Sequence, residues 1–297
     1  DIAAVAPDAS KANTAHNVQG SANWNIPNAI GSNVKVRVRV TNAPTTVEAI
    51  NSTFFKIVGK ITAITSPADA NPGPAEVWNA GDTTRVIRWD TVGSITKVDI
   101  DYATAAGGTC SGGSWTNIVT NYTVGAANEY TWPSIPLSIK TENAYLRVRD
   151  NRYPAETCLV MPDPFRIRPK ITVSTPTNDQ QLVVGTNYAN LIQWSYVGTG
   201  TAFVKIYYDT GAGTYTGVID DTGTVAIGAG AAGVTWNIPN TVALSNNSKI
   251  KVVDSVLGFE NVFGLSPTFN LKGGVTLTAP TGSTTTWLAQ TSSNIAW

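Results

Sequence analysis

The chain has 297 residues, 42% of them apolar and only 13% charged, and its 20 basic residues balance its 20 acidic residues. This length and apolar content suffice for two or three domains with buried cores. The zero net charge argues against a general nucleic-acid or anionic-membrane binder, and the sequence has no apolar run of about 18 residues that would cross a bilayer as a helix.

Residues 1–60 contain a pattern that returns further along the chain. It begins at Trp24 in the string Asn-Trp-Asn-Ile-Pro, continues in the alternating segment 34–40, and ends in the Phe-x-Ile segment 55–57. An apolar residue at every second position is typical of a half-buried β-strand. We therefore expect residues 1–60 to be the C-terminal half of a β repeat.

Residues 61–170 contain a complete copy of this repeat. Trp132 follows Trp24 by 108 residues, and the segments 144–150 and 165–167 repeat the alternating strand and the Phe-x-Ile strand. The copy also has a first half, made of strands predicted at 61–64, 86–89 and 97–102 and a glycine-rich turn at 107–108.

Residues 171–274 contain a second complete copy, in which Trp236 follows Trp132 by 104 residues. Its predicted strands match those of the first copy and lie at 171–174, 191–194, 204–208, 249–254 and 269–271. The segments 275–278 and 294–297 match the first two strands again. We expect residues 275–297 to be the N-terminal strands of a further repeat.

These repeats predict an all-β fold. Each copy holds about seven short strands separated by Gly, Pro, Asn and Thr, which is typical of an antiparallel sandwich of two facing sheets. No amphipathic helix of three turns is present. We predict tandem immunoglobulin-like antiparallel β-sandwiches whose cores contain the recurring tryptophans. These are Trp24, Trp89, Trp132, Trp194, Trp236 and Trp297.

Four strings of the repeat together resemble a known family. They are Ile-x-Trp, Val-Lys-Ile-x-Tyr, Trp-x-Ile-Pro and Lys-Ile-x-Val-x-Asp, which end at Trp194, Tyr208, Pro239 and Asp254. They look like the Ig-like domain of Ser/Thr-rich, glycolipid-anchored fungal wall proteins of the KNH type, which has relatives in tandem in large bacterial surface proteins. The resemblance covers nearly the whole chain and implies a wall-associated or surface array without catalytic residues. The sequence departs from the fungal type in its several copies and its lack of a Ser/Thr-rich tail.

Residues 1–60 and 275–297 each lack part of a repeat, which would leave an inner sheet face and unpaired strand edges in water. Three explanations are open. In the first, the chain is a segment of a longer array of repeats. In the second, strands of a neighbouring chain complete each partial repeat. In the third, the ordered portion of a repetitive fibre ends inside a repeat. The first two explanations both indicate an elongated assembly.

Cys110 and Cys158 are the two cysteines, and both lie in loop-like segments of one copy. The few lysines and the many Thr, Ser and Asn residues favour an extracellular or cell-surface location, where the pair would form a disulfide. The single histidine, His16, lies in another copy, so no metal site is expected.

Three tryptophans do not recur between copies, and they are the candidates for an exposed glycan-binding platform. They are Trp78, Trp115 and Trp287. A tryptophan that recurs on a strand is better explained by core packing.

Charged residues suggest two further sites. The Arg37–Arg39 and Arg147–Arg149 pairs are interpreted as ion-paired strand faces rather than as an anion-binding stripe, because no aromatic residues interleave with them. Asp99 and Asp101 share one strand face, as carboxylates do in glycosidases and Ca²⁺ sites. The equivalent positions of the next copy hold Lys205 and Tyr207, which argues against a catalytic pair.

The sequence therefore predicts a non-enzymatic, extracellular structural repeat protein that forms a surface fibre, filament or adhesin stalk, because stacked repeats make a rod whose length scales with copy number. The alternative is a carbohydrate-binding module of a cell-surface or wall-associated protein. The expected partners are copies of the chain itself or adjoining repeats of a longer chain, and cell-wall polysaccharide under the alternative. No nucleic-acid partner, cofactor or metal is expected.

Overall fold

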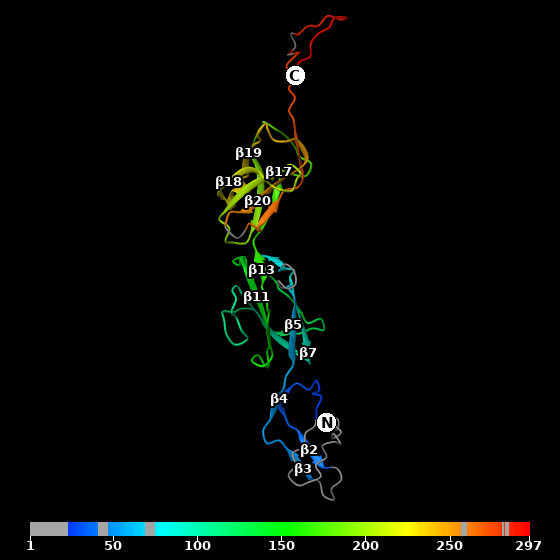
Figure 1. The fold of residues 1–297 in the computed structure, drawn as a ribbon, viewed down its shortest axis with the longest axis vertical. Coiled ribbons are helices and arrows are strands. Elements are labelled where there is room, and N and C mark those ends of the chain that lie inside the picture. The colour runs from blue at the N-terminus through cyan, green and yellow to red at the C-terminus, as the bar shows by residue number, and fades with distance from the viewer. Residues whose placement is uncertain (1–22, 41–46, 69–74, 257–259, 281, 283–284) are drawn as a thin grey trace. The chain divides into compact units, whose positions relative to one another are not determined.

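A computed structural model describes residues 23–40, 47–68, 75–256, 260–280, 282 and 285–297 (Figure 1). The chain forms two compact units. The first comprises the described residues up to Arg166 except Asn79–Asp82 and Ser134–Lys140, and the second comprises those two segments and the residues from Ile167 onward. No helix among the described residues is long and apolar enough to span a bilayer.

Nine strands between residues 60 and 168 form two sheets, which we call the first sandwich. The smaller sheet has the order β10-β7-β5, and the larger has the order β6-β13-β11-β8-β9 with β12 also paired to β11. The strands are β5 (Lys60–Ser66), β6 (Val77–Asn79), β7 (Val86–Val92), β8 (Lys97–Ala103), β9 (Thr116–Thr123), β10 (Glu129–Thr131), β11 (Thr141–Asp150), β12 (Cys158–Val160) and β13 (Phe165–Arg168).

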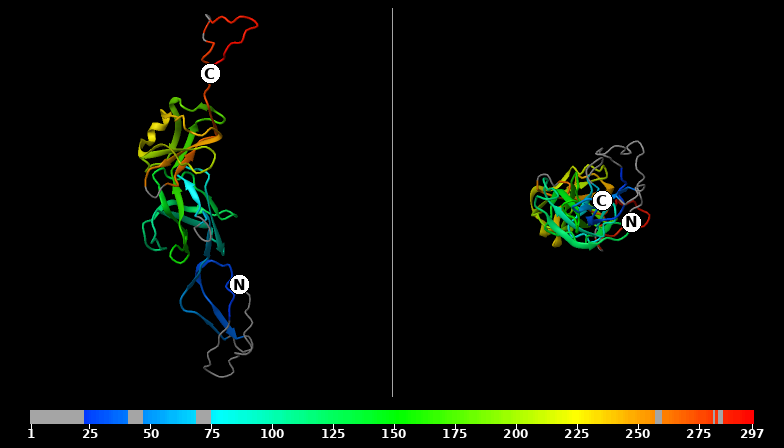
Figure 2. Two further views of the ribbon diagram at one scale, coloured as in Figure 1. Left: turned by 45° about the horizontal axis from the view of Figure 1, so that its top comes forward. Right: turned by 90° about the horizontal axis from the view of Figure 1, so that it is seen from below.

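Nine strands between residues 170 and 272 form the second sandwich, in the same order. The smaller sheet is β14-β16-β19, and the larger is β15-β22-β20-β17-β18 with β21 on β20. The strands are β14 (Lys170–Thr175), β15 (Gln181–Val183), β16 (Asn187–Val197), β17 (Phe203–Asp209), β18 (Gly217–Ala226), β19 (Val234–Asn237), β20 (Ser245–Asp254), β21 (Phe263–Leu265) and β22 (Phe269–Lys272). A 3-10 turn, η2 (Ile227–Ala231), is the yellow coil in Figure 2.

Side chains from both sheets meet in one core in each sandwich. In the second, Val173 and Trp194 of the smaller sheet pack with Ile206, Val252 and other buried residues of the larger sheet. Most strand pairs are antiparallel. β15 pairs with β22 in parallel, and the backbone hydrogen bonds from Arg166 to Glu76 and from Ala80 to Arg168 run in the same sense between β13 and β6. The predicted fold class, tandem immunoglobulin-like antiparallel β-sandwiches, is confirmed.

The recurring tryptophans are buried wherever both sheets are present. Trp89, Trp132, Trp194 and Trp236 are each at most 4% exposed. Trp24 is half-buried against the edge of the Phe55 ring. Trp297 is 79% exposed, which contradicts the prediction that it is a core residue, because no second sheet covers it within the described part of the chain.

The predicted strand at residues 34–40 is divided in the structure. β1 (Gly31–Val34) pairs with β4 (Phe55–Ile57), and β2 (Arg37–Val40) pairs with β3 (Val47–Ile50). In the first sandwich the equivalent β11 runs unbroken for ten residues, because β8 pairs with six of them. No strand equivalent to β8 lies beside β1 or β2 among the described residues. The N-terminal and C-terminal parts of this segment therefore pair with different strands, β4 and β3.

Residues 275–297 do not form the two strands predicted for them. Their described backbone contains one isolated antiparallel bridge, between Ala279 and Ala296. A pair of strands alone is marginal in water, and a third strand or a packed face is needed for independent stability.

Candidate functional site

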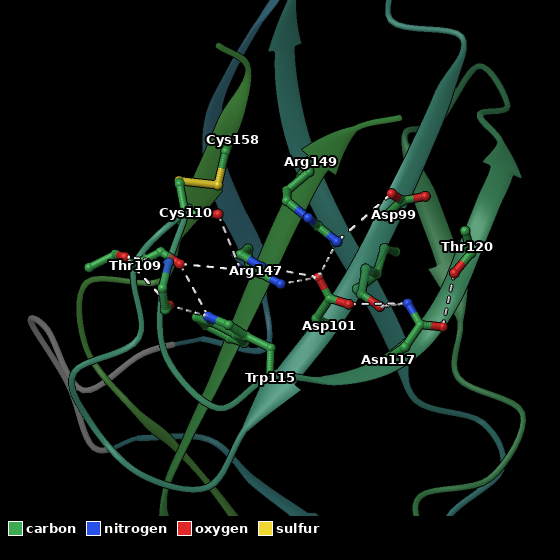
Figure 3. A network of polar contacts seen from close by, with 12 residues as sticks. Asp99, Asp101, Thr109, Cys110, Trp115, Asn117, Thr120, Arg147, Arg149 and Cys158 are labelled. Carbon is green, nitrogen blue, oxygen red and sulfur yellow. Dashed lines mark hydrogen bonds and ion pairs between the residues drawn. A yellow bond between two sulfur atoms is a disulfide. The ribbon is translucent and has the colours of Figure 1, made fainter. Parts of the chain in front are cut away.

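A connected group of polar side chains lies on β8 and β11 of the first sandwich (Figure 3). Strand register places Arg147 opposite Asp101 and Arg149 opposite Asp99. The alternate residues of both strands, such as Ile100 and Val148, fill the core. Opposite charges that face each other across two antiparallel strands stabilise the pair of strands. The charged residues therefore pair on one face of the sheet, and the apolar residues between them form the core on the other face.

Arg147 is the centre of this group. Its Nε and Nη2 atoms lie 3.0 and 2.9 Å from Oδ2 of Asp101, and its Nη1 donates to the backbone carbonyls of Thr109 and Cys110 at 3.2 Å each. Arg147 and Asp101 are 7% and 3% exposed. A buried ion pair is retained only when hydrogen bonds satisfy the rest of both groups, and this pair meets that condition.

Trp115 covers the guanidinium of Arg147. The Arg147 Cζ atom lies 4.6 Å from the centre of the ring, a cation–π distance. The indole Nε1 donates to the carbonyls of Thr109 and Gly112, at 3.1 and 3.0 Å. Gly108 makes room for the ring, because a Cβ at this position would stand 2.4 Å from it.

Asparagine side chains satisfy the remaining carboxylate oxygens. Asp101 Oδ1 accepts from Asn117 at 3.1 Å, and Asp99 Oδ1 accepts from the Asn151 side chain and the Asn121 amide, both at 2.8 Å. Arg149 Nη2 lies 3.1 Å from Asp101 Oδ2 and 3.8 Å from Asp99 Oδ2. Both carboxylates are therefore held by fixed donors.

The disulfide between Cys110 and Cys158 closes this group at one edge (Figure 3). Cys158 stands opposite Arg149 in the pairing of β12 with β11, and Cys110 follows the loop that carries Thr109. The bond thus ties the loop that accepts from Arg147 to the strand beside it. We call this connected set of side chains, with Arg147 at its centre and the disulfide at its edge, the arginine brace.

The arginine brace is suited to holding strands together rather than to chemistry. A general acid or base needs a carboxylate that can reach a reacting group, whereas Asp99 and Asp101 are buried and bonded within the protein. Among the residues that the structure describes, no group of three or more His, Cys, Asp or Glu side chains is placed to hold a metal ion. His16 lies outside the described residues.

The three tryptophans proposed as a glycan platform lie in different environments. Trp78 is 1% exposed, packs edge-on against Phe165 and donates to Glu76, so the prediction that it binds a ligand is corrected: no ring face is free. Trp115 belongs to the arginine brace, and its nitrogen is already bonded. Trp287 is 44% exposed and belongs to the second unit, whereas Trp78 and Trp115 belong to the first.

The other arginine pair is also matched by an acid. Arg37 and Arg39 lie 3.8 and 3.4 Å from the Glu48 carboxylate on the neighbouring strand β3. This agrees with the prediction of ion-paired strand faces. The exposure of all three side chains limits what such pairs contribute to stability.

Sequence reasoning missed Asp209 at the end of β17. Its Oδ2 accepts the amides of Gly211 and Gly213 at 2.8 Å each, and its Oδ1 accepts the amide of Thr214 at 3.3 Å. Burial raises the pKa of this carboxyl, but the backbone hydrogen bonds together lower the pKa below its ordinary value. The Asp-x-Gly-x-Gly spacing at 209–213 was the available signal, since aspartate commonly bonds the amides of the turn that follows it.

Comparisons with known proteins give no family. No protein-family model matches the sequence, and no curated protein matches it. Solved structures that resemble the chain include the four N-terminal Ig domains of Dscam1 (10% identity, TM-score 0.24, covering 76% of this chain and 51% of that one). Others are three N-terminal domains of the bacteriophage RB49 outer capsid protein Hoc (10%, 0.27, 81% and 78%) and Drosophila N-cadherin EC1-4 (10%, 0.22, 86% and 62%). The chain spans about half the length of the Dscam1 structure.

Proposed function

We propose that this chain belongs to an extracellular structural protein in which sandwich repeats follow one another as a surface fibre, filament or adhesin stalk. In this proposal residues 61–170 and 171–274 are complete repeats and residues 1–60 are the C-terminal half of one. Residues 275–297 would supply the N-terminal strands of another once the rest of that repeat pairs with them. The supporting observation is that one strand order occurs twice in succession along the chain.

The arginine brace supports a load-bearing role for the first sandwich. Its ion pairs, cation–π contact and disulfide join the 104–115 loop, β8, β11 and β12. Fixed internal contacts of this kind resist separation of the strands and present no free group for catalysis. A disulfide also fits an oxidising, extracellular compartment, which is the location that the resemblance to surface and wall proteins implies.

Exposed apolar side chains support association with further protein. Val38 and Phe54 are 66% and 59% exposed, and Val275 and Trp297 are 78% and 79% exposed. All four side chains belong to the segments proposed as incomplete repeats, whose inner face a complete sandwich would cover. Adjoining repeats of a longer chain, or strands of a second copy, would cover them.

Electron microscopy of the native material tests this proposal. Fibres or rods with a regular axial repeat would support it, and denaturing mass analysis would show whether the polymer consists of separate copies or one long chain. Single compact particles at every protein concentration would overturn the structural role. The alternative of a carbohydrate site built on these tryptophans has little support, because Trp78 is buried and the Trp115 ring packs on Arg147.

A further inference from the structure

The face of the second sandwich that corresponds to the arginine brace is built differently. Strand register is the same, because Asp254 lies opposite Val204 in the second sandwich as Asp150 lies opposite Val98 in the first. Lys251 therefore takes the place of Arg147, and Tyr207 takes the place of Asp101. The remaining pair, Asp99 and Arg149, is replaced by Lys205 and Val253.

These replacements leave two lysines without the acids that serve the first sandwich. Lys205 and Lys251 are diagonal neighbours on adjacent strands, a spacing of about 7–8 Å between Cα atoms. Within the described part of the chain, no carboxylate lies within ion-pair distance of either ammonium group. Like charges so placed repel one another, and an anion bound between them would remove that repulsion.

Aromatic side chains replace the disulfide at the same edge. Phe263 stands opposite Val253 in the pairing of β21 with β20, as Cys158 stands opposite Arg149. The Lys251 Nζ atom lies 4.4 Å from the centre of the Phe263 ring and 5.8 Å from that of Tyr215. Phe263 is 43% exposed and borders the cavity through its contact with Lys251.

A cavity of about 390 Å³ is lined by Lys251 and other residues of β17 and β20. The two strands are labelled in Figure 1. The lining of the cavity includes Lys205, Tyr207 and Lys251 on the two strands, with Ser255 and Glu260 beyond the end of β20. Asp254 also lines it, but this carboxylate is 1% exposed and accepts from the Thr201 hydroxyl and the Val256 amide. The volume is at the lower end of the range for small-ligand sites.

We propose that this cavity is a binding site for an acidic saccharide, in which a uronate carboxylate lies between Lys205 and Lys251. The apolar face of the sugar ring would pack on Phe263 and Val253, and its hydroxyls would bond Tyr207 and Ser255. A free inorganic anion would contact only the two lysines and none of the other groups. A neutral sugar would contact those other groups but would leave the two positive charges without a counter-ion. The inference does not rest on the fibre proposal, and either can fail without the other.

Calorimetric titration of the full chain with tri-galacturonate, at low ionic strength, tests the site. We expect saturable binding that weakens as salt is raised, and at least tenfold weaker binding by Lys251→Gln and by Phe263→Ala. Lys272→Gln is the matched control, because Lys272 lies on β22 and bonds Asn246 outside the cavity. Glu260→Gln, which removes an acid from the lining, is expected to tighten binding.

Three comparison ligands decide between the alternatives. A neutral glucose trisaccharide should not bind, inorganic phosphate should bind far more weakly, and a glutamate tripeptide should bind without dependence on Phe263. Equal binding of the neutral trisaccharide, or of phosphate, would overturn the proposal. So would an unchanged affinity in Lys251→Gln and Phe263→Ala, with thermal unfolding confirming that both variants are folded.

Discussion

The guanidinium of Arg147 holds one carboxylate oxygen of Asp101 with two N–H groups, at 2.9 and 3.0 Å, and both side chains are buried. Removing one charge of such a pair leaves the other buried without compensation. We expect Asp101→Asn to lower the free energy of unfolding of the first sandwich by about 3 kcal/mol. Calorimetric unfolding of the full chain measures this, with the second sandwich as internal reference.

The control for that variant is Glu129→Gln, which breaks the exposed pair of Glu129 with Arg88. Exposed pairs contribute less than about 1 kcal/mol. An equal loss in the two variants would show that the burial of the Arg147–Asp101 pair is energetically irrelevant, and that the arginine brace is not a stabilising device.

The disulfide is expected to stabilise the first sandwich alone. It closes a sequence separation of 48 residues, for which loop-closure entropy gives about 4 kcal/mol. Reduction, or the double variant Cys110→Ser/Cys158→Ser, should lower the unfolding temperature of the first sandwich. The second contains no cysteine, so its transition should not move, and a shift in both would contradict the assignment.

Gly108 is predicted to tolerate no side chain. The Cβ of Gly108→Ala would stand 2.4 Å from the Trp115 ring and displace the indole from Arg147. We expect a loss of about 1–3 kcal/mol, the usual result of overpacking. Gly125→Ala is the matched control, because nothing lies within 4 Å of its Cβ position. Comparable stability of the two variants in chemical denaturation would argue against the packing of Trp115 on Gly108.

Asp209 should make the second sandwich sensitive to acid. Its pKa is lowered in the folded state, so the ionised group stabilises the fold fully above the unfolded pKa of about 3.9. This stability is lost as the pH falls from that value through the lower folded pKa. Asp209→Asn should destabilise the sandwich near neutral pH and flatten the dependence of its unfolding temperature below pH 4. A parallel acid profile in the variant would contradict this role.

The repeat made much of the fold predictable. The tryptophans and the alternating strands recur at a nearly constant spacing, so the strands predicted for one sandwich also predicted those of the other. Trp78 was misassigned because it does not recur. Its equivalent on β15 is the buried Leu182, and a core position filled by different apolar residues in two copies is hidden from a search for repeated tryptophans.

The candidate sites were less predictable, because they depend on strand register. The sequence places Asp99 and Asp101 on one face, but it does not show that Arg149 and Arg147 stand opposite them on β11. The same limit concealed Phe263, whose proximity to Lys251 depends on the pairing of β21 with β20. The division of residues 34–40 into β1 and β2 likewise reflects which partner strands are present.

Single-molecule stretching of the full chain tests the account most directly, because it measures whether the sandwiches bear load separately. We predict two unfolding events, one for each sandwich. The Cys110–Cys158 bond shields the enclosed loop from extension, so adding reductant should lengthen one event by about 17 nm, at about 0.36 nm for each of 48 residues. The other event should be unchanged. Extension without discrete events, or a single event with no response to reductant, would contradict the account.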